Sequence, residues 1–171
     1  MRVLLIGLMG SGKTTVGRRL SRETGWPYLD NDQMLRDATG LTAPELIEAQ
    51  GEAALHTAEL AAFERALEAP TPVIVGVAGW IVADPESRAG LNDAGVVVWL
   101  RAQPDTLQTR AGTGRGRRSD ATSSEWIRRA AAERAPLFES VADLVIDVDL
   151  RRPPQIVEQI LALPAVRSNE E

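Results

Sequence analysis

The sequence contains no cysteine, one histidine and one lysine among its 171 residues. The absence of cysteine excludes a disulfide scaffold, a thiolate nucleophile and a cysteine-ligated zinc or iron–sulfur site. Because His56 is the single histidine, a metal site built from several histidines is excluded as well. No apolar run approaches the ~20 residues that cross a bilayer. We therefore expect a cytoplasmic protein that does not associate with membranes.

The charge balance disfavours nucleic acid as a partner. Nineteen basic residues stand against 24 acidic ones, which gives a formal net charge of −5, and this net charge opposes nonspecific binding to polyanions. Every cation except Lys13 is an arginine. Codon usage in a GC-rich genome would explain the preference for arginine, but a lone lysine inside a glycine-rich loop also invites a chemical explanation.

Short apolar runs alternate with helical patterns, which predicts a parallel sheet with helices on both faces. We expect a single domain over residues 1–163, a flexible tail over 164–171, and a monomer. Ligands of such sheets bind beyond the carboxyl ends of the strands. The expected strands are 3–6, 26–29, 72–75, 96–100 and 144–146, and the expected helices are 14–23, most of 43–67 with a break near Gly51, 104–110, 125–133 and 154–163.

A phosphate-binding loop follows the first strand directly. The residues from Gly7 to Thr14 match G-x-x-x-x-G-K-T and open a helix. In this motif glycines let the backbone N–H groups turn toward phosphate oxygens, and the helix adds its unpaired amino-terminal donors. Lys13 would reach the β and γ phosphates, and the Thr14 hydroxyl would ligate Mg²⁺. The expected nucleotide-binding residues of the loop are Gly10, Ser11, Gly12, Lys13, Thr14 and Thr15.

Two carboxylates follow the second strand. Asp30 and Asp32 are two residues apart, so they share one side of an extended backbone. One acid can hold a water of the magnesium shell, and the other can accept a proton from an attacking hydroxyl. In the alternative interpretation, one of them caps a helix that starts near Gln33.

Residues 112–124 form the one long segment with turn chemistry and dense positive charge. Glycine and arginine alternate from Gly112 to Arg117, which is typical of a flexible, phosphate-seeking segment. We expect a mobile lid here, closing over the transition state. A solvated basic loop is the alternative.

From residue 2 to about residue 163, the chain resembles the shikimate kinase family of small P-loop kinases. The resemblance implies a three-layer α/β/α sandwich of the nucleoside-monophosphate-kinase type, with a central five-stranded parallel sheet. It also implies ATP as cosubstrate, Mg²⁺ as cofactor and phosphorylation of a ring hydroxyl on a small-molecule acceptor. It rests on the phosphate loop, Leu29-Asp30-Asn31-Asp32, Gly51-Glu52 with Glu59, the turn from Gly76 to Gly79, Arg110, Arg117, and the run from Arg134 to Phe138.

The same resemblance implies a role for individual residues. Lys13 and Thr14 take the phosphate and magnesium roles described above. Asp30 corresponds to the magnesium-associated acid, and Asp32 corresponds to the acid that binds the acceptor hydroxyls near the point of transfer. The arginine counterparts are Arg117 at the phosphates and acceptor, Arg134 at the acceptor carboxylate, and Arg110 and Arg152 at the adenine.

Two departures from the family pattern fall in the acceptor site. His56 stands where the family usually places a second carboxylate-binding arginine, and imidazole cannot form a bidentate fork to a carboxylate. In the alternative interpretation His56 is a partly exposed helix residue paired with Glu59. The family's run of three glycines is here Val77-Ala78-Gly79, whose side chains would crowd a loop that contacts the acceptor. Trp80 either faces this pocket or belongs to the core.

Three functions remain open at this point. The first is an ATP-dependent kinase for shikimate or a related small cyclic polyol, with His56, Gly79 and Arg134 as further acceptor-binding residues. The second is a kinase for a different acceptor, such as a sugar or an aminocyclitol. The third is a nucleotide-binding protein with degraded acceptor chemistry. The intact Lys13 and Asp32 argue against the third.

Overall fold

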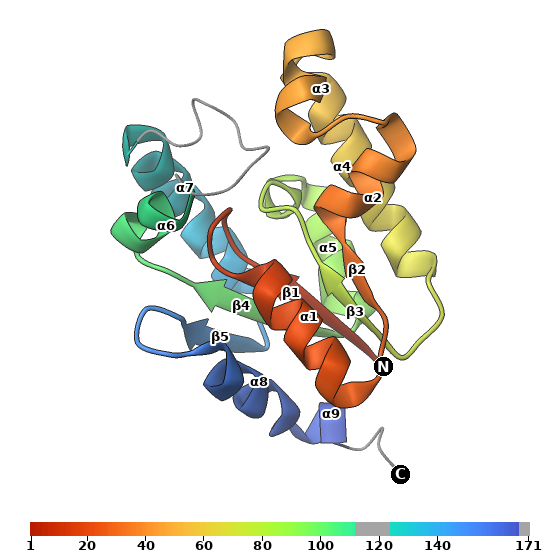
Figure 1. Cartoon of the computed structure of the whole chain (residues 1–171), viewed down its shortest axis with the longest axis vertical. Helices are drawn as coiled ribbons and strands as arrows, with labels where there is room; N and C mark the ends of the chain where they lie inside the picture. Colours follow the sequence, from red (N-terminus) through yellow and green to blue (C-terminus); the bar gives the residue numbers. More distant parts are fainter. Residues whose placement is uncertain (112–123, 168–171) are drawn as a thin grey trace.

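The computed structural model describes residues 1–111 and 124–167 (Figure 1). Within these residues, parallel strands form one five-stranded sheet in the order β2-β3-β1-β4-β5. This confirms the predicted α/β sandwich with a central parallel sheet. The predicted mobile lid over residues 112–124 lies outside the described residues, except for Ser124, which begins a helix. The strands are β1 (Arg2–Ile6), β2 (Tyr28–Asp30), β3 (Val73–Gly76), β4 (Val96–Arg101) and β5 (Leu144–Asp147).

Helices cover both faces of the sheet, because side chains alternate between the faces along each buried strand. In β1, Leu4 and Ile6 pack in one core cluster with α4, α5, α6 and α7, whereas Val3 and Leu5 pack in a second cluster with α1, α8 and α9. The helices are α1 (Lys13–Thr24), α2 (Asn31–Thr39), α3 (Ala43–Gln50), α4 (Glu52–Glu68), the 3₁₀ turn η1 (Ile81–Ala83), α5 (Pro85–Ala94), α6 (Pro104–Ala111), α7 (Ser124–Val141), α8 (Pro153–Leu161) and α9 (Pro164–Arg167).

Two groups of helices flank the carboxyl end of the sheet. The group α2, α3 and α4 has a small core of its own, formed by Leu35, Leu46 and Leu55. Helices α6 and α7 lie on the opposite side, and the loop between β1 and α1 lies between the two groups (Figure 1). That loop follows β1, the central strand of the sheet. Strand β3 lies on one side of β1 and β4 lies on the other, so the strand order reverses at β1. Such a reversal of strand order is where open parallel sheets bind ligands.

Four helical segments differ from the sequence prediction. Helix α5 was not predicted, α2 was expected only in the alternative interpretation of the acidic pair and from near Gln33, and α7 continues past residue 133 through Pro136 to Val141. Proline removes one helical hydrogen bond, but Phe138 and Val141 beyond it are buried in the core, so tertiary packing maintains the helix. The first residues of the expected flexible tail, Pro164–Arg167, form α9, in which Val166 is buried.

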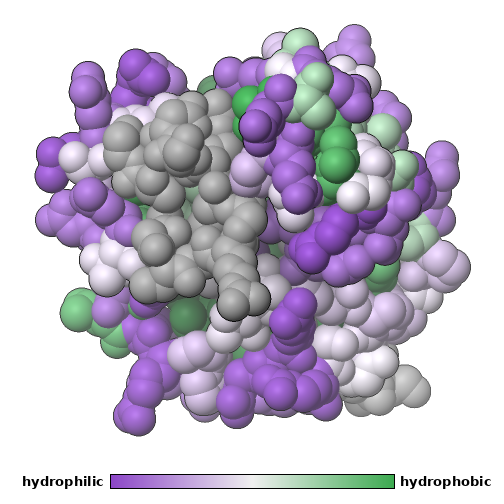
Figure 2. Space-filling view, turned by 45° about the horizontal axis from the view of Figure 1, so that its top comes forward, coloured by the Kyte–Doolittle hydropathy of each residue, from purple (hydrophilic) through white to green (hydrophobic). Residues whose placement is uncertain are grey.

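The face that carries the carboxyl ends of the strands is largely hydrophilic. Figure 2 brings this side of the molecule forward and shows hydrophobic residues in small patches among polar ones. In the part of the chain that the structure describes, none of the helices has the length and apolar character needed to traverse a lipid bilayer.

Candidate active site

The phosphate loop adopts a conformation that requires glycine. Gly7, Gly10 and Gly12 have φ angles of 142°, 90° and 98°, a region that residues with a side chain rarely adopt. A Cβ atom at Gly7 would also overlap the backbone oxygen of Leu100. Gly12 is the N-cap of α1 and has no side chain with which to cap it, so the first amides of α1 are available to an anion.

The Lys13 side chain folds back over the phosphate loop. Its Nζ donates hydrogen bonds to the backbone oxygens of Gly7 at 2.7 Å and Leu8 at 3.2 Å. The ammonium group therefore lies over the loop, where the predicted phosphates would bind. Of the other predicted nucleotide residues, Gly10, Gly12, Thr14 and Thr15 line the adjoining cavity, whereas Ser11 is buried.

The Asp30 carboxylate lies beside the first turn of α1. Its Oδ2 accepts a hydrogen bond from the Thr14 hydroxyl at 2.8 Å, and its Oδ1 accepts one from the backbone N–H of Asp32 at 3.0 Å. The second contact makes Asp30 the N-cap of α2, which begins at Asn31 rather than near Gln33. The two interpretations of the acidic pair are therefore compatible, because Asp30 caps a helix with one oxygen and meets Thr14 with the other.

The donor set at Thr14 and Asp30 fits Mg²⁺. Both groups are hard oxygen donors, and Mg²⁺ is usually bound by one or two such side chains together with substrate phosphates. No cluster of three or more histidine, aspartate or glutamate side chains suited to a metal occurs in residues 1–111 and 124–167.

Tyr28 is a site residue that the sequence analysis missed. Its hydroxyl donates to Asp30 Oδ2 at 3.3 Å, and the residue lines the cavity. Burial raises the pKa of the Tyr28 phenol far above its ordinary value, and the negative charge of Asp30 raises it further. The strand period of two, which places Tyr28 and Asp30 on one face, was the available signal.

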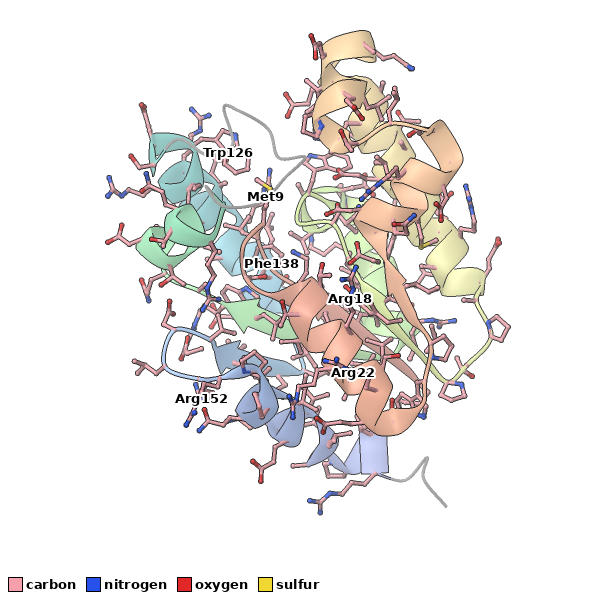
Figure 3. The ribbon with its side chains drawn as sticks, viewed as in Figure 1. Met9, Arg18, Arg22, Trp126, Phe138 and Arg152 are labelled. Carbon is pink, nitrogen blue, oxygen red and sulfur yellow. The ribbon has the colours of Figure 1, made fainter. Side chains whose placement is uncertain are left out.

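One cavity of about 480 Å³ connects the phosphate loop to the predicted acceptor residues. Asp32, His56, Gly79 and Arg134 all contribute to its wall. They come from α2, α4, the turn after β3, and α7, so both helical groups flanking the sheet supply side chains. Met9 of the phosphate loop and Trp126 of α7, labelled in Figure 3, also line the cavity.

His56 packs against the aromatic ring that follows the glycine turn. Its imidazole stacks on the indole of Trp80, with centroids 3.9 Å apart and planes 8° from parallel. His56 Nε2 lies 3.7 Å from Oε1 of Glu52, one turn earlier in α4, and Glu59, one turn later, lies in the cavity wall. Trp80 thus lines the pocket and also packs against the core, and the stacked pair gives this part of the cavity an aromatic wall.

Arg134 of α7 is held beside the glycine turn in the cavity wall. Its Nη1 donates to the backbone oxygen of Gly79 at 3.3 Å, and its guanidinium carbon lies 5.7 Å from the ring centroid of Trp126. A guanidinium over an aromatic face is favourable electrostatically. These contacts orient a positive charge toward the cavity that Asp32 and His56 share.

The turn from Val77 to Gly79 lies between the core and the cavity. Val77 and Ala78 are only 2% and 9% exposed, and both belong to the core cluster under α4 and α7. Both residues also form part of the cavity wall, so the expected crowding of the acceptor by their side chains stays a prediction. A Cβ atom at Gly79 would lie 3.1 Å from the Gly7 backbone oxygen, so this turn needs glycine where it meets the phosphate loop.

Two of the three remaining arginines can be placed. Arg110, at the end of α6, lines the cavity. Arg152 is exposed at the N-cap of α8 and is not among the cavity-lining residues of the described chain (Figure 3). Arg117 lies outside the described residues, so its predicted role stays a prediction.

Comparisons with a family model, with curated sequences and with solved structures all find shikimate kinases. Residues 9–164 match the family model of shikimate kinase. A shikimate kinase from Symbiobacterium thermophilum is 35% identical over 165 residues, covering 94% of each chain, and one from Stenotrophomonas maltophilia is 36% identical over 151 residues, covering 86% of this chain and 82% of that one. A solved shikimate kinase from Acinetobacter baumannii, in complex with shikimate, superposes with a TM-score of 0.88 at 27% identity, covering 99% of this chain and 94% of that one.

Proposed function

Because this chain belongs to the shikimate kinase family, we propose that it transfers the γ-phosphoryl group of ATP to a ring hydroxyl of shikimate, with Mg²⁺ as cofactor. The family makes the chain a phosphotransferase with an alcohol acceptor. The identity of the acceptor is the part of the proposal that rests on the site.

The observation that carries the proposal is the continuity of one cavity. Lys13, Thr14 and Asp30 lie at its phosphate end, and Asp32 and Arg134 line the same cavity. Phosphoryl transfer requires little covalent work from a protein, and rate enhancement comes from positioning and charge neutralisation. A single cavity that holds both sets of groups can bring a phosphate and a hydroxyl into contact.

At the phosphate end, the loop amides and Lys13 bind the triphosphate. The loop carbonyls of Gly7 and Leu8 hold the Lys13 ammonium in place, so its position is set before the nucleotide binds. The Thr14 hydroxyl and Asp30 carboxylate would hold Mg²⁺, which neutralises phosphate charge when it is bound.

At the acceptor end, Asp32 orients the attacking hydroxyl and accepts its proton. Asp32 is exposed within the cavity and follows the N-cap of α2, so its carboxylate is accessible to a ligand. Arg134 binds the acceptor carboxylate through its guanidinium, which presents parallel N–H donors to two oxygens. Arg110 borders the nucleotide end. Roles for Arg117 at the phosphates and Arg152 at the adenine, a cytoplasmic location and a monomeric state are further predictions.

A coupled assay of ADP release tests the proposal. We expect saturable turnover with shikimate, and turnover reduced by about 10²- to 10⁴-fold in Asp32→Asn, which preserves size but removes the base. Quinate, gluconate, inositols and aminocyclitols serve as competing acceptors. Flat baselines with every acceptor, from a protein that still binds nucleotide, would favour a nucleotide-binding role with degraded acceptor chemistry.

The stacked pair His56–Trp80 favours a second candidate function, a kinase for a cyclic alcohol with less negative charge. The two rings are stacked with their centroids 3.9 Å apart and line the cavity, and an aromatic surface suits the apolar face of a ring polyol. Because His56 cannot form a bidentate fork, Arg134 is then the principal residue, among the described cavity residues, for binding a carboxylate. Saturation by an inositol or aminocyclitol without saturation by shikimate would select this candidate.

A further inference from the structure

We infer that Tyr28 is a positioning residue whose hydroxyl fixes the Asp30 carboxylate for the magnesium–nucleotide complex. The inference rests on the proposed function, since it assumes that this complex binds beside Thr14. It assigns a role to a side chain that neither the sequence motifs nor the acid pair identify.

The placement of the ring follows from the geometry of two neighbouring elements. Tyr28 and Asp30 are two residues apart in β2 and therefore face the same side of the sheet. On α1, Thr14 and Gly17 are three residues apart and share a helix face. Since Thr14 contacts Asp30, the next residue on that helix face, Gly17, lies against the next residue on that strand face, Tyr28.

Two glycines leave space for the Tyr28 ring. A Cβ atom at Gly17 would overlap the ring carbons, and a Cβ atom at Gly76, in β3, would overlap the hydroxyl oxygen. Gly76 is also the register partner of Asp30 in the sheet. The ring thus fits between α1 and β3 with its hydroxyl directed at the carboxylate, and any larger residue at either glycine would displace it.

Three donors then fix the Asp30 carboxylate. Thr14 and Tyr28 donate to Oδ2, and the Asp32 backbone N–H donates to Oδ1. The Thr14 hydroxyl donates its hydrogen bond to Asp30, so the lone pairs of its oxygen can bind a metal. Without the Tyr28 hydroxyl, Oδ2 retains one donor and the carboxylate has greater freedom to rotate away from that metal.

The variant Tyr28→Phe removes the hydroxyl and keeps the ring. Calorimetric titration with a non-hydrolysable ATP analogue, with and without Mg²⁺, gives two affinities for each protein. We expect the metal-free affinity of Tyr28→Phe to stay within about twofold of wild type, and the gain in affinity on adding Mg²⁺ to fall about 3- to 10-fold, the range for one hydrogen bond. An unchanged gain would overturn the inference.

A double-mutant cycle with Asp30→Asn separates positioning from packing. If Tyr28 acts through Asp30, adding Tyr28→Phe to Asp30→Asn changes the Mg²⁺-dependent gain no further. Gly17→Ala, which displaces the ring by a different route, is expected to reduce the gain in the same direction. A full effect of Tyr28→Phe in the Asp30→Asn background would show that the hydroxyl acts elsewhere.

The result is independent of the acceptor. Nucleotide binding without turnover on any acceptor would overturn the proposed acceptor chemistry and leave the Tyr28 inference intact if the cycle holds. A wild-type protein that binds no nucleotide would overturn both. Thermal unfolding of each variant, followed without ligand, distinguishes a loss of metal response from a loss of folded protein.

Discussion

The imidazole of His56 lies flat on the indole of Trp80, 3.9 Å away between ring centroids. This contact joins α4 to the turn after β3, and both residues line the cavity. His56 is also the position at which the family pattern predicts an arginine, so the pair marks one departure from that pattern.

Restoring the family's charge at this position is expected to strengthen carboxylate binding. In His56→Arg, a guanidinium replaces an imidazole that cannot form two parallel hydrogen bonds, so we expect the KM for shikimate to fall by up to about tenfold. His56→Gln is the matched control, since it removes the ring without adding charge. Steady-state kinetics at saturating ATP measure the change, and an equal KM in both variants would contradict the prediction.

Arg134 is expected to determine the affinity for a carboxylated acceptor. Loss of a bidentate, charge-assisted contact in Arg134→Gln should raise the KM for shikimate by about 10- to 100-fold. Arg134→Lys keeps the charge but not the planar fork, and it should lie between wild type and Arg134→Gln. The KM for ATP is the internal reference. A parallel rise in both KM values would indicate a general disturbance of the cavity.

Lys13 is expected to act on catalysis and not on folding. Lys13→Met keeps a linear side chain of similar size but removes the ammonium that lies over the loop carbonyls, and kcat should fall by about 10²- to 10³-fold or more. Thermal unfolding without nucleotide should change little. Turnover close to the wild-type rate would contradict the role assigned to the loop.

The ion pair at the end of β4 and β5 is expected to make stability depend on pH. Hydrogen bonds from Arg101 to both oxygens of Asp147 hold the pKa of that carboxyl below its ordinary value of 3.8. A folded-state pKa below the unfolded one stabilises the fold above about pH 3.8, and the contribution is lost as the pH falls through the lower folded-state value.

The variant Asp147→Asn tests this dependence. Both partners are more than 40% exposed, so we expect a loss of at most about 1 kcal/mol in the free energy of unfolding at pH 7. Urea denaturation at pH 7 and near pH 3 should show the difference between the two proteins shrinking on acidification. A constant difference would mean that Asp147→Asn acts through something other than charge.

The strands and the phosphate loop could be predicted because their signals are local. Continuous apolar runs mark the buried strands, and the spacing of Gly7, Gly12 and Lys13 identifies the loop without any tertiary information. Helix α5 also had a local signal, since Asp84 accepts from Ser87 N–H as an N-cap and Pro85 follows at the first helical position. The continuation of α7 through Pro136 had none, because burial of Phe138 overrides a local helix breaker.

The acceptor end could be predicted only in part. The family resemblance implied that His56 and Arg134 belong to it, and both line the cavity, but stacking of His56 on Trp80 depends on how α4 approaches the turn after β3. The sequence did not indicate that Val77 and Ala78, which line the cavity, also pack in the core cluster. Tyr28 contacts Asp30 only because Gly17 and Gly76, distant in sequence, leave room for its ring.

The distribution of indole rings has a practical consequence. Trp80 and Trp126 line the cavity, whereas Trp26 and Trp99 are 7% and 6% exposed in the two core clusters. A ligand that enters the cavity is expected to change the surroundings of the first two fluorophores, whereas Trp26 and Trp99 do not line this cavity. The protein therefore carries its own optical reporter of occupancy, with an internal background that does not respond, and needs no attached dye.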